Sequence, residues 1–351
     1  MIIVEEKKKK TPNKNIVWTF VSLILAVFTI NMVVKQSKGL SLSELMEVIA
    51  SSDKLFLTLS VICSWLFVWF EAMSLKSILS FAGYKRSSLS CVLYSSSDIY
   101  FSAITPSASG GQPAAGYFMH LDNIPGGVIT ATLILNLMGY TLGVVIVGVA
   151  AIFIDPAAFM SFAIPARILI VTGFLVLTFF SVFFLCILRR GDRVYDFVSK
   201  VVDFLCDKKL LKHREAKQKR VAKAREDYIT CSKVIAGKKR VISLAIFWNL
   251  MQRIAQIIVP GLIYYALKYD GKMAVTVVIR QCLITMGYNF VPIPGAMGVS
   301  DYLMIDGYSG IMDVDFAYQL EMITRGMTFY VCVAFCAIIT LVGYVFWRKK
   351  K

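Results

Sequence analysis

Seven ionisable side chains lie within or close to long apolar stretches of this 351-residue chain. The basic ones are Arg253, Arg280 and Arg325, and the acidic ones are Glu71, Asp98, Asp301 and Glu321. A charge at the centre of a bilayer costs at least about 2.5 to 3.5 kcal/mol, so such residues normally face the protein interior, where they pair or serve function. Guanidinium groups stay charged and bind phosphate oxygens as a fork, which makes the three arginines candidate ligands for a lipid phosphate.

Each of these charges also has a purely structural interpretation. Glu321 and Arg325 are four residues apart, a spacing that suits a local salt bridge on one helix. Arg253 and Arg280 have no obvious local partner, which favours a functional role. Among the acids, Glu71, Asp98 and Glu321 are candidates for proton coupling, the ordinary driving device of secondary transporters.

Two segments rich in glycine and proline interrupt otherwise helical patterns, at residues 88–121 and 273–311. The first predicts short helices from Leu89 to Ile104 and up to His120, separated by Thr105-Pro106-Ser107-Ala108-Ser109-Gly110-Gly111-Gln112-Pro113. The second predicts a helix to Phe290, the breaker Val291-Pro292-Ile293-Pro294-Gly295-Ala296-Met297-Gly298, and a short helix from Val299. Proline and glycine at this density prevent a continuous helix. Inside a membrane, broken backbone is tolerated only where it is buried in protein or lines a wet cavity.

These breakers and the arginines together form the predicted substrate site. The Gly110-Gly111-Gln112-Pro113 start would present free backbone N–H groups, and Pro113 suits the first turn of a helix. The predicted substrate-binding residues are Thr105, Pro106, Gly110, Gly111, Gln112, Pro113, Arg253, Arg280, Pro294, Gly295, Gly298, Asp301 and Arg325. The alternative is that both segments are ordinary loops.

The elements that must position these residues are membrane spans. With 57% hydrophobic residues, 17% charged residues and a mean hydropathy of +0.68, the chain is too apolar for an ordinary soluble protein. Runs long enough to cross a bilayer as helices occupy residues 16–34, 55–81, 127–154, 167–188, 241–267 and 319–347. The predicted fold is therefore one all-α polytopic membrane domain over residues 1–351, with about six spanning helices and two broken re-entrant helical hairpins.

The orientation follows from the basic residues. Lysines 7 to 10 and Lys14 lie in the tail 1–15, and basic residues end the chain, so the positive-inside rule places both termini in the cytoplasm. Residues 189–240 hold 17 Lys/Arg against 7 Asp/Glu and should also face the cytoplasm. This loop is amphipathic, which favours a helix lying against anionic lipid over a solvated linker.

The order of elements predicts an internal repeat. Each half contains two spans, a broken hairpin and a further span, and the two hairpins would enter the membrane from opposite sides. Interrupted segments at corresponding places in inverted halves indicate a transporter substrate site near the midplane.

The sequence offers few residues for metal binding, disulfide formation or catalysis. The eight cysteines are scattered without metal-ligand spacing and only two histidines are present, so we expect no disulfides, no metal, no cofactor and no catalytic triad. The net charge of +16 comes with no nucleic-acid-binding motif, so we expect lipid and not nucleic acid as its partner. The GxxxG pattern from Gly139 to Gly143 leaves the oligomeric state open, because it packs helices within one chain as easily as between chains.

At these residues the chain resembles the membrane half of the bifunctional lysylphosphatidylglycerol synthase/flippase family, which also has stand-alone members. The resemblance spans nearly the whole chain and is clearest in residues 105–113, in residues 292–298 with the acid that follows, and in Arg325 with Tyr330. The second motif departs from the family pattern, with Ala296 where a glycine is common and Asp301 where a glutamate is common.

The resemblance implies a flippase-like lipid transporter of the bacterial cytoplasmic membrane. Its substrate would be an anionic or aminoacylated phospholipid or a polyprenyl phosphate. A second hypothesis is a phosphatidylglycerol lysyltransferase, which makes lysyl-phosphatidylglycerol from lysyl-tRNA and confers resistance to cationic peptides, or the membrane partner of a separate synthase. We expect the soluble synthase domain to be absent, because the last apolar run ends a few residues before Lys351. A third hypothesis is a membrane scaffold whose basic loop docks partners.

Overall fold

A computed structural model describes residues 47, 49–105, 108–189, 222–223, 225–226, 228–229, 239–267, 271–291, 293–296 and 298–349. The chain divides into two units, Met1–Ala50 and Ser51–Lys351, and the helices below belong to the second. The predicted first span, the basic tail 1–15 and most of the loop 189–240 lie outside the described residues.

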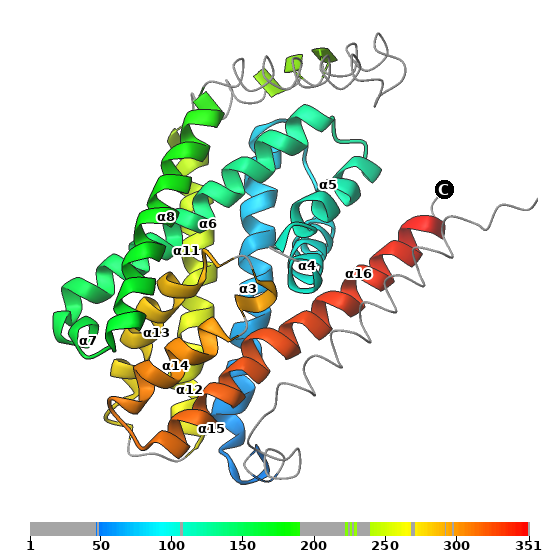
Figure 1. The fold of residues 1–351 in the computed structure, drawn as a ribbon. Helices are drawn as coiled ribbons and strands as arrows, with labels where there is room; N and C mark the ends of the chain where they lie inside the picture. Colours follow the sequence, from blue (N-terminus) through cyan, green and yellow to red (C-terminus); the bar gives the residue numbers. More distant parts are fainter. Residues whose placement is uncertain are drawn as a thin grey trace, which may run out of the picture. The chain divides into compact units, whose positions relative to one another are not determined.

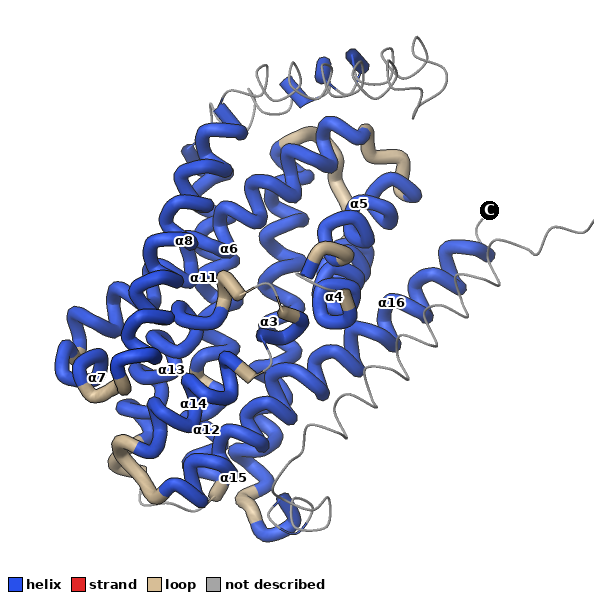
Figure 2. Tube along the Cα trace, viewed as in Figure 1, coloured by secondary structure: helices blue, strands red, loops and turns tan. Residues whose placement is uncertain are grey.

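The described residues form helices and loops, and no strand occurs among them (Figure 2). The elements are α3 (Lys54–Phe81), α4 (Ser88–Ile104), α5 (Gly111–Leu121), α6 (Gly126–Ile154), α7 (Pro156–Met160), α8 (Ile164–Arg189), α11 (Lys239–Ile257), α12 (Val259–Ala266), α13 (Ala274–Tyr288), η2 (Pro294–Ala296), α14 (Val299–Ser309), α15 (Val314–Arg325), η3 (Gly326–Val331) and α16 (Cys332–Lys349) (Figure 1). The all-α prediction is confirmed.

Five helical segments of the described chain are long and apolar enough to cross a membrane. They are Lys54–Phe81, Gly126–Ile154, Ile164–Leu188, Lys239–Ala266 and Val314–Phe346. Each overlaps one of the six predicted spans. The chain is thus a multi-pass membrane protein.

Two of these segments are not uniform helices. Lys239–Ala266 is divided near Ile258 into α11 and α12, because Pro260 in the first turn of α12 has no N–H to continue the helix. Val314–Phe346 contains the π-helical segment η3, Gly326–Val331, between α15 and α16. The first interruption follows α11, which contains Arg253, and the second directly follows Arg325. Both arginines are predicted substrate ligands.

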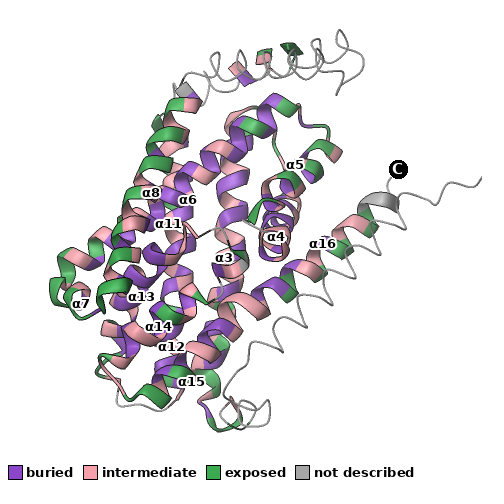
Figure 3. Ribbon diagram, in the orientation of Figure 1, coloured by how far each residue is buried: buried purple, intermediate pink, exposed green. Residues whose placement is uncertain are grey.

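Helix α3 is the centre of the packing. It contacts α4, α6, α11, α12, η3 and α16, while α6 also contacts α8, α11 and α13. Buried residues accordingly concentrate on α3, α6 and α11, and exposed ones on the outer faces of α8 and α16 (Figure 3). The exposed side chains of α8 and α16 include Leu175, Phe179, Val182, Leu341 and Val345, all apolar, as expected for surfaces that face lipid.

Small residues let α6 approach α11 closely. A Cβ at Gly139 would lie 2.9 Å from Asn249 Nδ2 and 3.1 Å from the Ala245 carbonyl, and one at Gly143 would lie 3.4 Å from the Asn249 carbonyl. The GxxxG pattern is therefore used for packing within the chain. Asn249 Nδ2 donates to Asn136 Oδ1 (3.0 Å) and Ser74 Oγ (2.9 Å), which ties α6, α11 and α3 together through a buried polar cluster.

Candidate functional site

The first break in the backbone lies between α4 and α5. Thr105 Oγ1 donates to the Phe101 carbonyl at 2.6 Å and accepts the Gly110 N–H at 2.9 Å. Its hydroxyl therefore binds both the last turn of α4 and the residue before α5. Helix α5 begins at Gly111, which places Gln112 and Pro113 in its first turn. Pro106 lies outside the described residues.

Asp98 of α4 is the anionic side chain that lies against the start of α5. Gln112 Nε2 donates to Asp98 Oδ2 at 2.7 Å, and Ser102 Oγ donates to Asp98 Oδ1 at 3.2 Å. A Cβ at Gly111 would collide with Asp98 and Ser102, so only glycine permits this approach. A helix N-terminus favours negative charge, and here the carboxylate of Asp98 provides that charge.

A second carboxyl group adjoins Asp98. Glu71 of α3 lies within hydrogen-bonding reach of Asp98, and Glu71 Oε2 accepts from Gln252 Nε2 of α11 at 2.8 Å. Both acids are 6% exposed. Two neighbouring buried carboxyl groups cannot both ionise at low cost, so the pair is suited to holding a single proton.

The second break in the backbone is held by Arg325. Its Nε lies 3.0 Å from Asp301 Oδ1, and its Nη1 donates to Ser300 Oγ (2.6 Å) and to the Gly295 carbonyl (3.0 Å). Glu321, the local partner suggested by the four-residue spacing, is more distant at 3.9 Å. Arg325 therefore pairs mainly with Asp301 and joins α15 to η2 and α14.

The backbone of this second break requires glycine. Gly295 and Gly298 have φ values of +61° and +82°, in the left-handed region that other residues rarely adopt. Gly298 N–H donates to Asp301 Oδ2 at 2.9 Å, so the acid that pairs with Arg325 also caps α14. Pro294 opens η2, and η2 contacts α4 of the first broken segment. The second break thus lies against α4 of the first broken segment.

Arg253 of α11 has a different environment from Arg325. It is 2% exposed, and its guanidinium carbon lies 4.8 Å and 4.2 Å from the ring centroids of Phe67 and Tyr140. Its Nη1 donates to Gln256 Oε1 at 3.0 Å and lies 3.4 Å from the Tyr140 hydroxyl, which donates to Asn289 Oδ1. Its Nε and Nη2 make no hydrogen bond to the described residues. Arg253 therefore retains unused N–H groups in a fully buried position.

Arg280 of α13 binds the end of another helix. It is 5% exposed, its Nη1 donates to the Gly307 carbonyl in the last turn of α14, and its guanidinium lies 6.0 Å from the Phe162 ring centroid. Asp155 and Asp306 are the carboxylates within its electrostatic range. These contacts suit a cation that stabilises a helix C-terminus.

Five ionisable side chains form one connected group, which we call the polar core: Glu71, Asp98, Arg253, Tyr288 and Arg325. Glu71 lies within electrostatic range of Asp98 and Arg253, and Tyr288 lies within range of Arg253 and Arg325. The polar core joins α3, α4, α11, α13 and α15. It brings together two of the three predicted arginines and two of the predicted coupling acids, while Glu321 lies beside it through Arg325.

Several residues of this region were not predicted from the sequence, namely Gln252, Tyr140, Tyr288, Asn289 and Ser300. Polar side chains inside apolar stretches were the available signal, and Gln252 directly precedes Arg253. Their partners lie up to 181 positions away in the chain, so spacing alone could not identify them.

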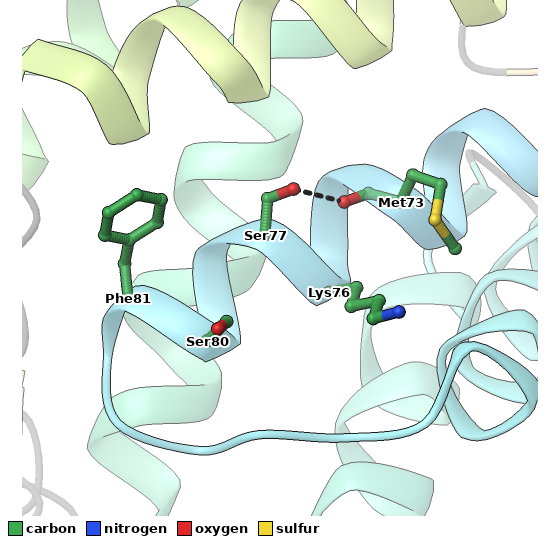
Figure 4. Close-up of a pocket in the computed structure, with 5 residues that line it drawn as sticks. All are labelled: Met73, Lys76, Ser77, Ser80 and Phe81. Atoms are coloured by element: carbon green, nitrogen blue, oxygen red, sulfur yellow. Dashed lines mark hydrogen bonds between the residues drawn. The ribbon is translucent and has the colours of Figure 1, made fainter.

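A separate pocket lies near the end of α3. Its volume is about 320 Å³, and it is lined by Met73, Lys76, Ser77, Ser80 and Phe81 (Figure 4). None of the predicted site residues is among these five. Within the described part of the chain, no group of three or more His, Cys, Asp or Glu side chains could hold a metal ion.

Comparison with known proteins identifies one family. The family model described as "Lysylphosphatidylglycerol synthase TM region" matches residues 16–336. No curated protein and no solved structure was found to match the chain.

Proposed function

The chain belongs to the lysylphosphatidylglycerol synthase transmembrane family, and from this premise we propose that it moves lipids with a phosphate-containing head group across the membrane. The substrates would be anionic or aminoacylated phospholipids or a polyprenyl phosphate. The membrane would be the bacterial cytoplasmic membrane, with both termini on the cytoplasmic side. A separate synthase would supply any aminoacylated lipid.

One observation supports this proposal above the others. Arg253 is 2% exposed, and two of its guanidinium nitrogens have no partner among the described residues. Burying a cation is costly unless it is paired, and the rings of Phe67 and Tyr140 compensate only in part. A phosphate group would supply the missing acceptors and would satisfy the guanidinium fork.

The neighbouring carboxyl groups suggest how transport is driven. Asp98 lies against the first turn of α5. Protonation of the Glu71 and Asp98 pair would remove its negative charge and leave the N-terminus of α5 and Arg253 available to a phosphate. Loss of that proton would then repel the phosphate and favour its release. Arg325 would keep the second break in place through Asp301 and Gly295.

Reconstitution in liposomes tests the proposed function. The purified chain would be inserted in vesicles that carry fluorescent phosphatidylglycerol, lysyl-phosphatidylglycerol or a polyprenyl phosphate, and exposure of the label to an outside quencher would be followed. We expect faster translocation of at least one of these lipids than in protein-free vesicles, and loss of that activity in Arg253→Gln. Failure of the wild-type chain to move any of the three lipids would refute the proposal.

The family description also names a synthase, so a role in making lysyl-phosphatidylglycerol is the second candidate. Lipid extracts from a deletion strain distinguish the two. Loss of lysyl-phosphatidylglycerol itself would favour synthesis. An unchanged total with less of the lipid in the outer leaflet would favour transport.

A further inference from the structure

The segment Val314–Phe346, which contains Arg325, changes its helical geometry near the middle of its length. Gly326–Val331 forms a π-helical segment, η3, directly after Arg325 and before α16. A π-turn holds one residue more than an α-turn, and such turns occur frequently at functional sites. They also interrupt the regular hydrogen-bond ladder, which makes them places where helices bend. The segment Val314–Phe346 can therefore bend at η3 more easily than elsewhere.

Among the described residues, the hydroxyl group of Ser64 makes the hydrogen bond between α3 and η3, and Phe329 of η3 packs on the apolar cluster around Val68 of α3. Ser64 Oγ lies 2.9 Å from the Met327 carbonyl of η3 and 3.1 Å from the Ser60 carbonyl of its own helix. A hydroxyl has one hydrogen to donate, so these two acceptors compete for it. If η3 moves away, Ser64 retains a hydrogen bond to Ser60. Separation of the two helices thus leaves the Ser64 hydroxyl with a hydrogen-bond acceptor.

Helix α16 covers the acidic side of the polar core. Cys332, Val333 and Cys336 of α16 pack with Val68 of α3 and with Tyr100 and Ala103 of α4 in one apolar cluster, which we call the α16 seam. Cys336 lies within electrostatic range of Glu71. The opposite face of α16 is exposed at Ile338, Leu341 and Val345. Among the described helices, α16 therefore covers the Glu71 and Asp98 pair on this side.

The first and second parts of the span are held differently. Before η3, Arg325 fixes α15 to α14 and η2 through Asp301, Ser300 and the Gly295 carbonyl. After η3, the seam of α16 is apolar apart from a long contact of Cys332 Sγ with the Ser64 carbonyl at 4.0 Å. In a bilayer, lipid tails replace apolar contacts at little cost, because they are as apolar as the side chains that they displace. The polar anchor thus stays in place while the apolar part is free to separate.

We propose that η3 is a hinge on which α16 swings away from α3 and α4, so that the α16 seam opens as a lateral path for a lipid head group between the bilayer and the polar core. This inference rests on the proposed lipid transport for its purpose, but the hinge motion itself is measurable without transport. The lipid tails would remain in the bilayer while the head group passes through the seam.

Distance measurement tests the hinge directly. Spin labels would be carried by unnatural amino acids at Tyr318 of α15 and Leu341 of α16, both exposed positions, which spares Cys332 and Cys336 in the seam. The full chain would be placed in lipid nanodiscs with and without phosphatidylglycerol. We expect two distance populations whose ratio changes with the lipid. A single distance under both conditions would overturn the hinge.

Two variants alter the hinge without touching the polar core. Deletion of Thr328 removes the extra residue of the π-turn and restores an α-helical register for the rest of the span. Gly326→Ala adds a methyl group where nothing lies within 4 Å, so it restricts the backbone without disturbing packing. We expect each to collapse the two distances to one, with binding of short-chain phosphatidylglycerol retained. If the deletion fails to fold, Gly326→Ala decides alone, and two unchanged populations in the folded variants would overturn the proposal.

Transport assays on the same proteins separate this inference from the proposed function. Two distances in a wild-type chain that moves no lipid would leave the hinge standing and refute the transport function. Transport at the wild-type rate by a chain locked at one distance would refute the hinge and leave the transport function standing.

Discussion

Three buried arginines of this protein differ in how many of their donors are used. Arg325 has a carboxylate partner at 3.0 Å, and Arg280 donates to a carbonyl at the end of α14. Arg253 is the most deeply buried of the three and holds two nitrogens without a hydrogen bond to the described residues, whereas Arg280 holds one, its Nε. Since a buried cation normally pairs, the unused donors of Arg253 make it the strongest candidate for direct contact with a substrate anion.

Replacement of Arg253 by lysine tests that assignment. Lysine keeps the charge but lacks the planar fork, so we expect binding of short-chain phosphatidylglycerol to weaken about ten- to hundredfold, the effect of losing one charge-assisted hydrogen bond of about 1.5–3 kcal/mol. Titration calorimetry in detergent would measure it. Arg280→Lys is the matched comparison, because it should lower thermal stability and leave the affinity unchanged. Equal losses of affinity in the two variants would contradict the special role of Arg253.

The Glu71 and Asp98 pair should couple transport to protons. We expect an imposed pH gradient to accelerate lipid translocation by the wild-type chain in liposomes. Glu71→Gln and Asp98→Asn each remove one of the two carboxyl groups, so translocation should become slower and independent of the gradient. Glu47→Gln is a suitable control, because Glu47 is exposed and precedes α3 in the chain. Persistence of gradient-driven transport in both core variants would exclude the pair as the coupling site.

Asp301 both pairs with Arg325 and caps α14. Asp301→Asn removes the charge at one end of the ion pair, and because both side chains are partly exposed we expect a loss of about 1–3 kcal/mol in stability. Asp301→Glu should retain most of the stability, since the carboxylate is kept. Thermal unfolding in detergent would measure both. A glutamate variant as unstable as the asparagine variant would indicate that geometry and not charge is required at this position.

At the scale of elements, close packing of α6 on α11 fixes the position of Arg253. Gly139 and Gly143 permit the approach, and the Cγ of Arg253 itself would lie 3.5 Å from a Cβ at Gly143. The buried cluster of Asn249, Asn136 and Ser74 then joins the same helices to α3, which bears Glu71. The arginine and the acid are thus carried by helices that this buried cluster joins.

Gly139→Ala should loosen that contact. The added methyl group would meet Asn249 Nδ2 at 2.9 Å and the Ala245 carbonyl at 3.1 Å, so the helices must separate slightly. We expect a loss of about 1–3 kcal/mol, as for other overpacked positions. Gly126→Ala is the control, because nothing lies within 4 Å of its added methyl group. Unfolding curves of the two variants that coincide would contradict the close approach of α6 and α11.

At the scale of the whole molecule, the polar core lies where the two broken segments meet. Asp98 belongs to the first segment, Arg325 holds the second, and η2 contacts α4 directly. The opposed orientation of these segments, the inverted relation of the two halves and the cytoplasmic position of both termini remain predictions from the order of elements and the basic residues.

Topology mapping checks those predictions. Reporter fusions should show the loop around Lys85 and Arg86 in the cytoplasm and the α7 region around Ser161 outside. The C-terminus should lie in the cytoplasm. Reporters active only in the cytoplasm and only outside would be fused in parallel at each position. A cytoplasmic signal at Ser161 would refute the predicted orientation, because α6 would then either cross the membrane in the opposite direction or not cross it.

Composition and apolar run length determined the architecture of this protein without help from tertiary structure. Only helices of about 20 residues or more can cross a bilayer. Five of the six predicted spans correspond to such helical segments, and the first predicted span, 16–34, lies outside the described residues. The places where helices cannot continue were equally visible, because glycine and proline act locally: α5 begins at Gly111 and α14 at Val299, next to the breakers.

Only the tertiary structure decided which side chains meet. Spacing along one helix suggested Glu321 as the partner of Arg325, but Asp301 from another helix lies closer. From the sequence, the three arginines were predicted to form one site. In the structure, Arg280 of α13 binds the end of α14 and lies apart from the polar core, which holds Arg253 and Arg325. The π-turn after Arg325 left no signature in the hydropathy pattern. The physical reason is that hydrophobicity and backbone propensity are properties of single segments, while pairing of charges depends on contacts between residues far apart in the chain.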